Sequence, residues 1–229
     1  MKNKFFDLNV HSQPENSSSQ AELCEVSKRY GYSGIAFTNH SDFFGGRMEM
    51  NVWNFEVYNG VEIVSSVSKL KDEIRRFRPK VTVLSVHGGD ERINRMAVED
   101  RRVDILCHPE EVDGPGLNHV LARSATKNGV AIEFNIGEII HNRGRSRSRI
   151  LSFMAKNLKL ARKYDVPMVL TSSANSIYDL RAPREMMALA SLFGMTGEEA
   201  LIALSLTPQQ IIRDNMSRLP NGVEVVGSH

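Results

Sequence analysis

Short apolar runs alternate with helical stretches along the whole chain, and this alternation limits the folds that are open to it. Seven runs are rich in β-branched residues, and most are short and nearly all apolar. Such runs are typical of strands that are covered on both faces of a parallel sheet. The predicted strands are residues 5–8, 35–38, 57–63, 81–86, 103–106, 130–135 and 167–170.

Helical patterns fill most of the segments between these strands. Thr196 and Glu199 fit a capping box, and Pro208 suits the first turn of the last helix. Parallel strands joined by right-handed helical crossovers form either an open doubly wound sheet or a barrel. No repeat, linker or shift in composition divides the chain, so we expect a single domain over residues 1–229. The predicted helices are 19–30, 66–77, 118–127, 149–164, 183–193, 196–205 and 207–216.

Polar side chains at the strand ends favour the barrel. In a barrel the carboxyl ends of all strands meet at one mouth, whereas an open sheet brings together only the ends beside its switch point. Each predicted strand has a polar residue at or near its carboxyl end. These residues are Asn9, His11, Asn39, His40, Glu62, His87, His108, Glu133, Asn135, Thr171, Ser172 and Ser173. We therefore predict an α/β fold that closes into a (β/α) barrel.

Composition excludes several classes of protein. The two cysteines, Cys24 and Cys107, lie in apolar stretches and are too few for a disulfide scaffold or a thiolate zinc site. The aromatic share of 7% and the single tryptophan, Trp53, argue against a stacking-rich platform for single-stranded nucleic acid. No run is apolar enough to cross a bilayer and no secretion signal is visible, so we expect a soluble cytoplasmic protein.

Positive charge is concentrated in one stretch. Residues 139–164 contain eight Lys or Arg and no Asp or Glu, whereas the rest of the chain is net acidic. An apolar stripe at helical spacing runs from Ile150 to Ala161 with cations on the opposite side, and residues 143–149 read as a polar loop before this helix. Such a surface fits contact with the phosphates of a polyanion, and a merely solvated helix face is the alternative. The candidate contacts are Arg143, Arg145, Arg147, Arg149, Lys156, Lys159 and Lys163.

Two further segments follow predicted strands. Arg181 and Arg184 flank Pro183, which suits the start of a helix, and we expect both arginines at the barrel mouth as phosphate contacts. The segment 41–58 is rich in aromatic residues, and it is either a lid or partner-binding loop, or a plug whose rings fill the barrel. Its aromatic residues include Phe43, Phe44, Trp53 and Phe55.

Several motifs resemble the polymerase and histidinol phosphatase (PHP) family. "FFDLNVHS" is similar to the Asp-Leu-His-x-His-Ser opening of that family, and "IAFTNHSD", "NGVEI", "VHGGD" and "CHPE" resemble its later motifs in the same order. A closer resemblance is to the PHP-like protein subunits of archaeal and eukaryotic ribonuclease P, most specifically in "VAIEFNIGEII" and "TSSANSIYDLRAPREMMALASLFGM". The resemblance covers nearly the whole chain. It implies a TIM-like barrel of the PHP type, with about seven core parallel strands inside surrounding helices.

The PHP resemblance also implies a place for metal ions. In PHP hydrolases, clustered histidines and carboxylates hold divalent ions, one of which lowers the pKa of a bound water. Two positions depart from the pattern: Asn9 replaces the first His of the opening motif, and "SSANSI" offers Ser173 and Asn175 where the family has an Asp-x-His pair. We therefore expect remnants that hold no metal, and no catalytic residue in this chain. The matching positions are His11, His40, Glu62, His87 and His108.

The ribonuclease P resemblance implies removal of the 5′ leader from precursor tRNA, with the RNA subunit and its Mg²⁺ performing the chemistry. The chain would bind and stabilise ribonuclease P RNA beside ribonuclease P protein component 2 and the other protein subunits. It would hold no cofactor of its own and contact no membrane. Two alternatives stay open: a metal-dependent PHP phosphoesterase acting alone on a small phosphate ester, and a nucleic-acid scaffold outside ribonuclease P. The departures at Asn9 and "SSANSI" disfavour the phosphoesterase, and the basic helix fits the scaffold equally well.

Overall fold

Seven parallel strands form the core of the structure, a computed structural model that describes residues 3–45, 54–109 and 116–218. Each strand pairs with the next one along the chain, in the order β1 to β7. The predicted barrel strands are thus confirmed, with ends that shift by one or two residues. The strands are β1 (Phe6–Val10), β2 (Gly34–Phe37), β3 (Glu56–Ile63), β4 (Val83–His87), β5 (Ile105–Cys107), β6 (Ala131–Asn135) and β7 (Met168–Thr171).

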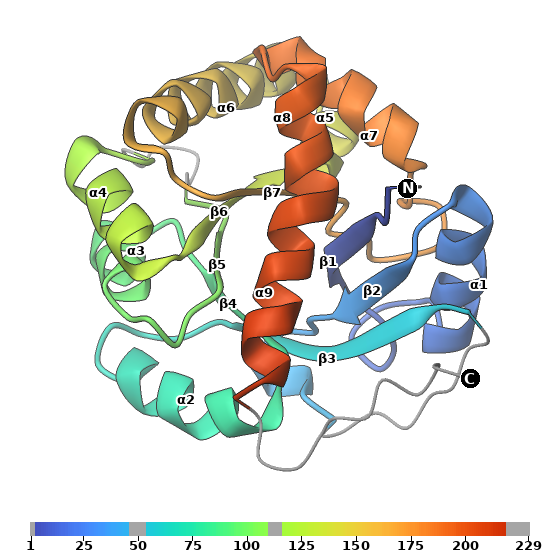
Figure 1. The fold of residues 1–229 in the computed structure, drawn as a ribbon, viewed down its shortest axis with the longest axis horizontal. Coiled ribbons are helices and arrows are strands. Elements are labelled where there is room, and N and C mark those ends of the chain that lie inside the picture. Colours follow the sequence, from blue (N-terminus) through green and yellow to red (C-terminus); the bar gives the residue numbers. More distant parts are fainter. Residues whose placement is uncertain (1–2, 46–53, 110–115, 219–229) are drawn as a thin grey trace.

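Helices surround this sheet (Figure 1). Ser19, Asp90, Asn118 and Thr196 cap four of them through side-chain oxygens, and Thr196 forms the expected capping box with Glu199. The helices are α1 (Gln20–Tyr30), α2 (Leu70–Phe77), α3 (Glu91–Val98), α4 (His119–Asn128), α5 (Ile136–His141), α6 (Gly144–Tyr164), α7 (Pro183–Ala190), α8 (Gly197–Leu201) and α9 (Thr207–Met216). Short 3₁₀ turns are η1 (Ser41–Phe43), η2 (Arg78–Lys80) and η3 (Ser191–Phe193), and a π turn, η4 (Ile202–Leu206), joins α8 to α9.

The barrel is nearly closed between β1 and β7. Val10 forms an isolated parallel bridge with Ala174, and the backbone N–H of His11 donates to the Ala174 carbonyl at 2.9 Å. Lower on the same seam, the buried carboxylate of Asp7 accepts a hydrogen bond from the backbone N–H of Ser172 at 3.1 Å. A few specific contacts therefore hold β1 against β7, in place of a continuous ladder of backbone hydrogen bonds.

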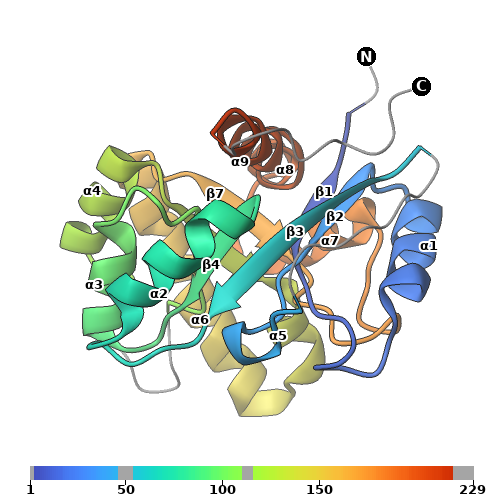
Figure 2. The same ribbon diagram turned by 90° about the horizontal axis from the view of Figure 1, so that it is seen from below.

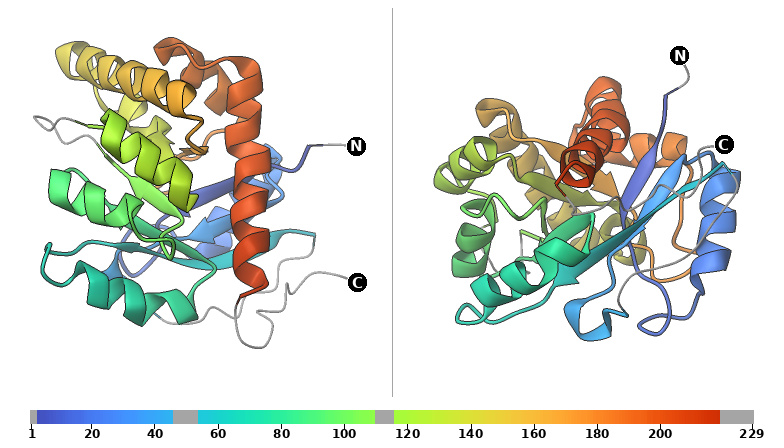
Figure 3. Two further views of the ribbon diagram at one scale, coloured as in Figure 1. Left: turned by 60° about the vertical axis from the view of Figure 1, so that its left-hand side comes forward. Right: turned by 60° about the horizontal axis from the view of Figure 1, so that its bottom comes forward.

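Helix α9 lies across the amino ends of the strands (Figures 1 and 2). Its Ile211 and Ile212 pack against the apolar side chains that fill the barrel interior, to which all seven strands contribute. The side chain of Asn215 donates to Asp104, just before β5, at 2.7 Å. Figure 3 shows the same helix spanning this end from two other directions. One end of the barrel is thus covered, and the carboxyl ends of the strands form the opposite face.

Helix α6 begins five residues earlier than predicted. The stretch 143–149 reads as a loop in the sequence because of its Gly, Ser and alternate arginines, but α6 begins at Gly144. The hydroxyl of Ser146 donates to the Asn142 side chain at 2.8 Å, and that of Ser148 donates to the Gly144 carbonyl at 3.2 Å. The serine hydroxyls thus bond to groups one turn back, so these polar side chains are accommodated within the helix. Helices α3 and α5 are also additions to the predicted set.

The aromatic segment after β2 is only partly described. Trp53 belongs to residues 46–53, which lie outside the described residues. Phe55 is buried, and the ring of Phe44 packs edge-on against Phe77 with centroids 5.2 Å apart. Phe43 keeps 45% of its surface exposed. The ring of Phe55 thus belongs to the core that the strands share with the surrounding helices, and neither Phe55 nor Phe43 is among the side chains that fill the barrel interior, so these two rings do not plug the barrel.

Asp7 gives the fold a testable pH dependence. Burial raises the pKa of its carboxyl to about 7, although hydrogen bonds from Ser172 and from the Asn9 backbone oppose this shift. Because the folded pKa exceeds the unfolded one, the folded state binds more protons, and stability falls as pH rises from about 4 to 7. We expect the Asp7→Asn chain to lack this fall in the free energy of unfolding, which amounts to up to about 4 kcal/mol in the wild type. Urea unfolding of both chains at pH 4.5 and 7.5 measures the difference, and parallel pH dependences would contradict it.

Candidate functional site

Four histidines lie side by side at the carboxyl ends of the first five strands. His11 follows β1, His40 follows β2, His87 ends β4 and His108 follows β5. The ring centroids of His11 and His40 are 4.8 Å apart, those of His40 and His87 5.6 Å, and those of His87 and His108 4.8 Å. We call these four histidines with Glu15, Glu62 and Glu133 the mouth cluster. Residues far apart in sequence meet here because parallel strands bring their carboxyl ends together.

Glu62 of β3 is the centre of the mouth cluster. Its carboxylate is fully buried and accepts a hydrogen bond from Nδ1 of His87 at 2.5 Å. Nε2 of His11 lies 3.6 Å from the same carboxylate, and Nε2 of His40 lies 3.9 Å away. Burial raises the pKa of Glu62, but the interactions with His11 and His87 outweigh it and hold this pKa well below its usual value. A buried charge thus has the partners that it requires.

Glu15 belongs to the same cluster and is absent from the sequence-based candidates. It accepts hydrogen bonds from the His40 ring and, at 2.8 Å, from the His40 backbone N–H, and its carboxylate lies 3.2 Å from Nδ1 of His11. Against the effect of burial, these contacts lower the pKa of Glu15 to about 2 and, with Glu62, raise that of His11 to about 9. Its position in the loop after the first strand, four residues beyond His11, is the signal that could have found it.

Asn9 joins the two buried carboxylates of the barrel interior. Its Nδ2 donates to Glu62 at 3.1 Å and to Glu133 at 2.8 Å, while its Oδ1 accepts from Thr38 at 2.8 Å. Glu133 also accepts a hydrogen bond from Thr171 at 2.6 Å. Asn9 therefore occupies the position between two carboxylates where a cation would otherwise balance them.

The end of β7 supplies no metal ligand to this cluster. Ser173 follows the strand in a left-handed conformation, with φ of 47°. The side chain of Asn175 accepts a hydrogen bond from Asn16 at 2.9 Å, and its backbone N–H donates to Asp179 at 3.2 Å. Neither Ser173 nor Asn175 offers an imidazole or a carboxylate, and Asn175 is engaged in hydrogen bonds with Asn16 and Asp179.

The donors that are present fit one divalent ion better than a pair. Ligand atoms of His11, Glu15 and His40 lie within 4.8 Å of one another, as do those of His40, Glu62 and His87. Nitrogen and carboxylate donors of this kind suit zinc or a similar ion, which would polarise a water or a phosphoryl oxygen. Both triplets use the ring of His40, so two ions would have to share it.

The basic segment forms one exposed face of α6. Five cations recur at helical spacing along this face, and Arg145 and Lys163 are about 27 Å apart along the axis at 1.5 Å per residue. Met154, Leu158 and Ala161 are buried on the other side, as the apolar stripe predicts. We call this set the α6 basic face, and it consists of Arg145, Arg149, Lys156, Lys159 and Lys163, all exposed.

Two other cations of the segment are used within the chain. Nε of Arg147 donates to the Asn142 carbonyl at 2.7 Å, which joins the first turns of α6 to the end of α5. Arg162 forms two hydrogen bonds to the carboxylate of Glu199 on α8, at 2.6 and 2.7 Å. The helical periodicity of the sequence does not predict these two contacts, because Arg147 bonds a residue just before α6 and Arg162 bonds a distant helix.

Arg181 lies on the flank of the barrel, and its predicted place at the mouth is wrong. The hydroxyl of Tyr32, between α1 and β2, donates to the Arg181 carbonyl at 3.0 Å. The Arg181 guanidinium donates to the carbonyls of Tyr178 and Leu180, both at 2.7 Å. The long connection from β7 to α7 carries this residue along α1, away from the histidines. Arg184 lies in the first turn of α7 and is exposed.

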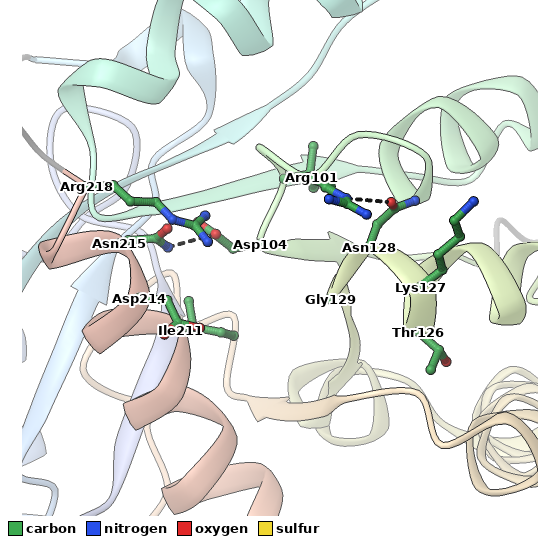
Figure 4. Close-up of a pocket in the computed structure, with 11 residues that line it drawn as sticks. Arg101, Asp104, Thr126, Lys127, Asn128, Gly129, Ile211, Asp214, Asn215 and Arg218 are labelled. Atoms are coloured by element: carbon green, nitrogen blue, oxygen red, sulfur yellow. Dashed lines mark hydrogen bonds between the residues drawn. The ribbon is translucent and has the colours of Figure 1, made fainter.

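The opposite end of the barrel carries a separate polar pocket of about 450 Å³ (Figure 4). It lies between the turn after α4 and the end of α9, with Arg101, Lys127 and Arg218 among its lining residues. Nearby, Arg78 donates to the Asp104 carboxylate at 2.7 Å and to the carbonyls of Val81 and Thr82. Arg78 therefore has a structural role at this end of the barrel. The pocket lies at the end opposite the mouth cluster.

Comparison with known proteins agrees with this architecture. Among the described helices, none combines the length and apolarity that a membrane crossing requires. The profile described as RNase P subunit p30 matches residues 4–219. The ribonuclease P protein component 3 of Methanococcoides burtonii is 48% identical over 225 residues, covering 96% of this chain and 93% of that protein. That of Methanosarcina mazei is 45% identical, covering 98% and 97%.

Solved structures show the same relationship. A chain in the cryo-EM structure of archaeal ribonuclease P with mature tRNA superposes with a TM-score of 0.76 at 28% identity, covering 97% of this chain and 99% of that one. Histidinol phosphate phosphatase of Lactococcus lactis shares the fold, with a TM-score of 0.54 at 12% identity over 93% of this chain and 94% of that one. The barrel, the altered metal cluster and these relatives lead to one conclusion: the chain belongs to the RNase P subunit p30 family.

Proposed function

We propose that the chain is a protein subunit of cytoplasmic ribonuclease P, which supports RNA-catalysed removal of the 5′ leader from precursor tRNA. The similarity to a chain of archaeal ribonuclease P and to named ribonuclease P components supports this assignment. The observation that carries it is the α6 basic face, where five exposed cations lie along one side of a helix whose sequence contains no acid. Such a face suits the phosphates of a folded RNA, which are read by position and shape.

In this proposal the chain holds RNA and leaves the chemistry to the RNA subunit and its Mg²⁺. Arginine and lysine side chains lower the repulsion between phosphates that a compact RNA brings together. Ribonuclease P protein component 2, the other protein subunits and precursor tRNA complete the assembly. The departures at Asn9, Ser173 and Asn175 support a mouth cluster that is not catalytic and a chain that holds no cofactor of its own.

Reconstitution tests this function directly. Purified chain is added to cognate ribonuclease P RNA with the other protein subunits, and precursor-tRNA cleavage is followed as Mg²⁺ is varied. We expect the chain to lower the Mg²⁺ concentration that half-maximal cleavage requires, because its cations replace part of the counterion atmosphere. Equal Mg²⁺ dependence with and without the chain would contradict the proposal.

The isolated chain should hydrolyse neither phosphate esters nor RNA, even with Mn²⁺ or Zn²⁺. A two-ion mechanism needs both ions fixed a few ångströms apart by several ligands, and Asn9 here donates a hydrogen bond to Glu62, one of the carboxylates that would bind them. Release of phosphate or nitrophenol from model esters provides the measurement. Turnover that disappears in both His11→Ala and His40→Ala would instead establish the phosphoesterase alternative.

A further inference from the structure

Tyr178 stands out from the loop between β7 and α7. Its exposed fraction is 81%, the largest among the bulky apolar and aromatic residues that the structure describes. The loop beneath it is fixed, because Arg181 donates to the Tyr178 carbonyl at 2.7 Å and the N–H of Ile177 donates to Ser18 at 3.1 Å. A ring held in water by a fixed backbone is a preformed contact for a partner.

The acids around this ring are already engaged within the chain. Asp179 lies 3.2 Å from Nε2 of His141 and accepts a hydrogen bond from the Ser176 hydroxyl at 2.8 Å. Glu185 accepts from the backbone N–H of Ala182 at 2.9 Å. These carboxylates thus accept hydrogen bonds from their own loop, which leaves the side chains of Arg143 and Arg184 available for a partner.

Two exposed arginines lie in the segments that adjoin this loop. The contact between Asp179 and His141 brings the β7–α7 loop against the end of α5, and Arg143 follows two residues later, at the start of α6. Further along the chain, Arg184 is exposed six residues after Tyr178. Within the described residues, neither Arg143 nor Arg184 forms an ion pair. The loop that carries Tyr178 therefore contacts the end of α5, just before α6, and the exposed arginines on either side of it in the chain form no ion pair with a described residue.

We infer that Tyr178 stacks on an unpaired base of the bound RNA, with Arg143 and Arg184 contacting the adjoining phosphates. This inference rests on the proposed function and names the class of nucleotide that this surface takes. Bases inside a double helix are stacked on one another, so an aromatic side chain can contact only a loop, bulge or end. One tyrosine is no stacking-rich platform, but it suffices for a single base.

The test compares Tyr178→Ala and Tyr178→Phe with Tyr30→Ala, a control at the end of α1 whose side chain is 40% exposed. Filter binding to ribonuclease P RNA is measured over a range of KCl concentrations. We expect Tyr178→Ala to weaken binding by about tenfold or more, the loss typical of one base stack, while the phenylalanine variant and the control keep wild-type affinity. The salt dependence of RNA binding by Tyr178→Ala should equal that of the wild type, because stacking releases no counterions. Arg184→Glu, by contrast, should flatten the salt dependence.

Two simpler probes sharpen the assignment. Tyr178→Ala should weaken binding to a single-stranded oligoribonucleotide and leave binding to a fully paired RNA duplex unchanged. Wild-type RNA affinity of Tyr178→Ala would overturn this inference, and so would a loss confined to affinity for another protein subunit. If reversing the α6 basic face weakens RNA binding in the same experiments, the proposed function survives that failure; if it also has no effect, the proposed function fails as well.

Discussion

Replacing the five cations of the α6 basic face by glutamate will weaken binding to ribonuclease P RNA by orders of magnitude. Each neutralised phosphate releases counterions, and each contributes roughly 0.7–0.9 to the slope of log K against log salt concentration. Losing five contacts should therefore flatten this slope by roughly 3 to 5. Fluorescence or filter binding between 50 and 500 mM KCl gives both quantities, and the far-ultraviolet circular dichroism should be unchanged because these side chains point away from the buried stripe.

A matched control lies on the other side of the molecule. Helix α2 with the residue before it and the turn after it also exposes five cations, and Figure 1 shows α2 and α6 at opposite sides of the barrel. Reversal of these residues changes net charge by the same amount and should have a much smaller effect on the salt slope. Equal effects of the two variants would show that total charge, not the α6 basic face, controls binding. The control residues are Lys69, Lys71, Arg75, Arg76 and Lys80.

Asn9→Asp should strongly destabilise the fold, because Asn9 lies between two carboxylates of the mouth cluster. The new carboxylate would lose both donated hydrogen bonds and would face Glu62 and Glu133, both at least 98% buried, from 3.1 and 2.8 Å. Breaking a buried charge network in this way costs about 3–5 kcal/mol. The loss should increase from pH 5 to pH 8, because protonation of the crowded carboxyl restores a donor at low pH.

Urea unfolding at the two pH values measures this effect. Asn59→Asp provides the control, because this half-buried asparagine of β3 donates only to the Lys80 carbonyl, at 3.1 Å, and its replacement should cost under about 1 kcal/mol. An Asn9→Asp chain as stable as wild type at pH 8, in metal-free buffer, would show that the amide does not balance the two carboxylates.

The sequence alone determines the barrel. Strand identity follows from apolar runs such as 130–135, because strands covered on both faces need apolar side chains throughout. The place of His11, His40, Glu62, His87 and His108 at one mouth follows from topology, because parallel strands align their carboxyl ends. The exposed side of α6 likewise follows from helical periodicity around a buried stripe.

Only the tertiary structure decides how these polar groups are paired. Glu15 joins the mouth cluster because the loop after β1 folds back beside His40, and nothing local in the sequence fixes that path. In the sequence, Asn9 stands where the PHP family has a metal-binding His. In the structure it links Glu62 of β3 to Glu133 of β6, two strands that are not neighbours. Hydrogen bonds between distant elements depend on how whole strands and loops pack. The periodicities of strands and helices, by contrast, involve only residues that are near one another in the sequence. The sequence therefore determines which groups reach the mouth, and the packing decides which of them neutralise one another.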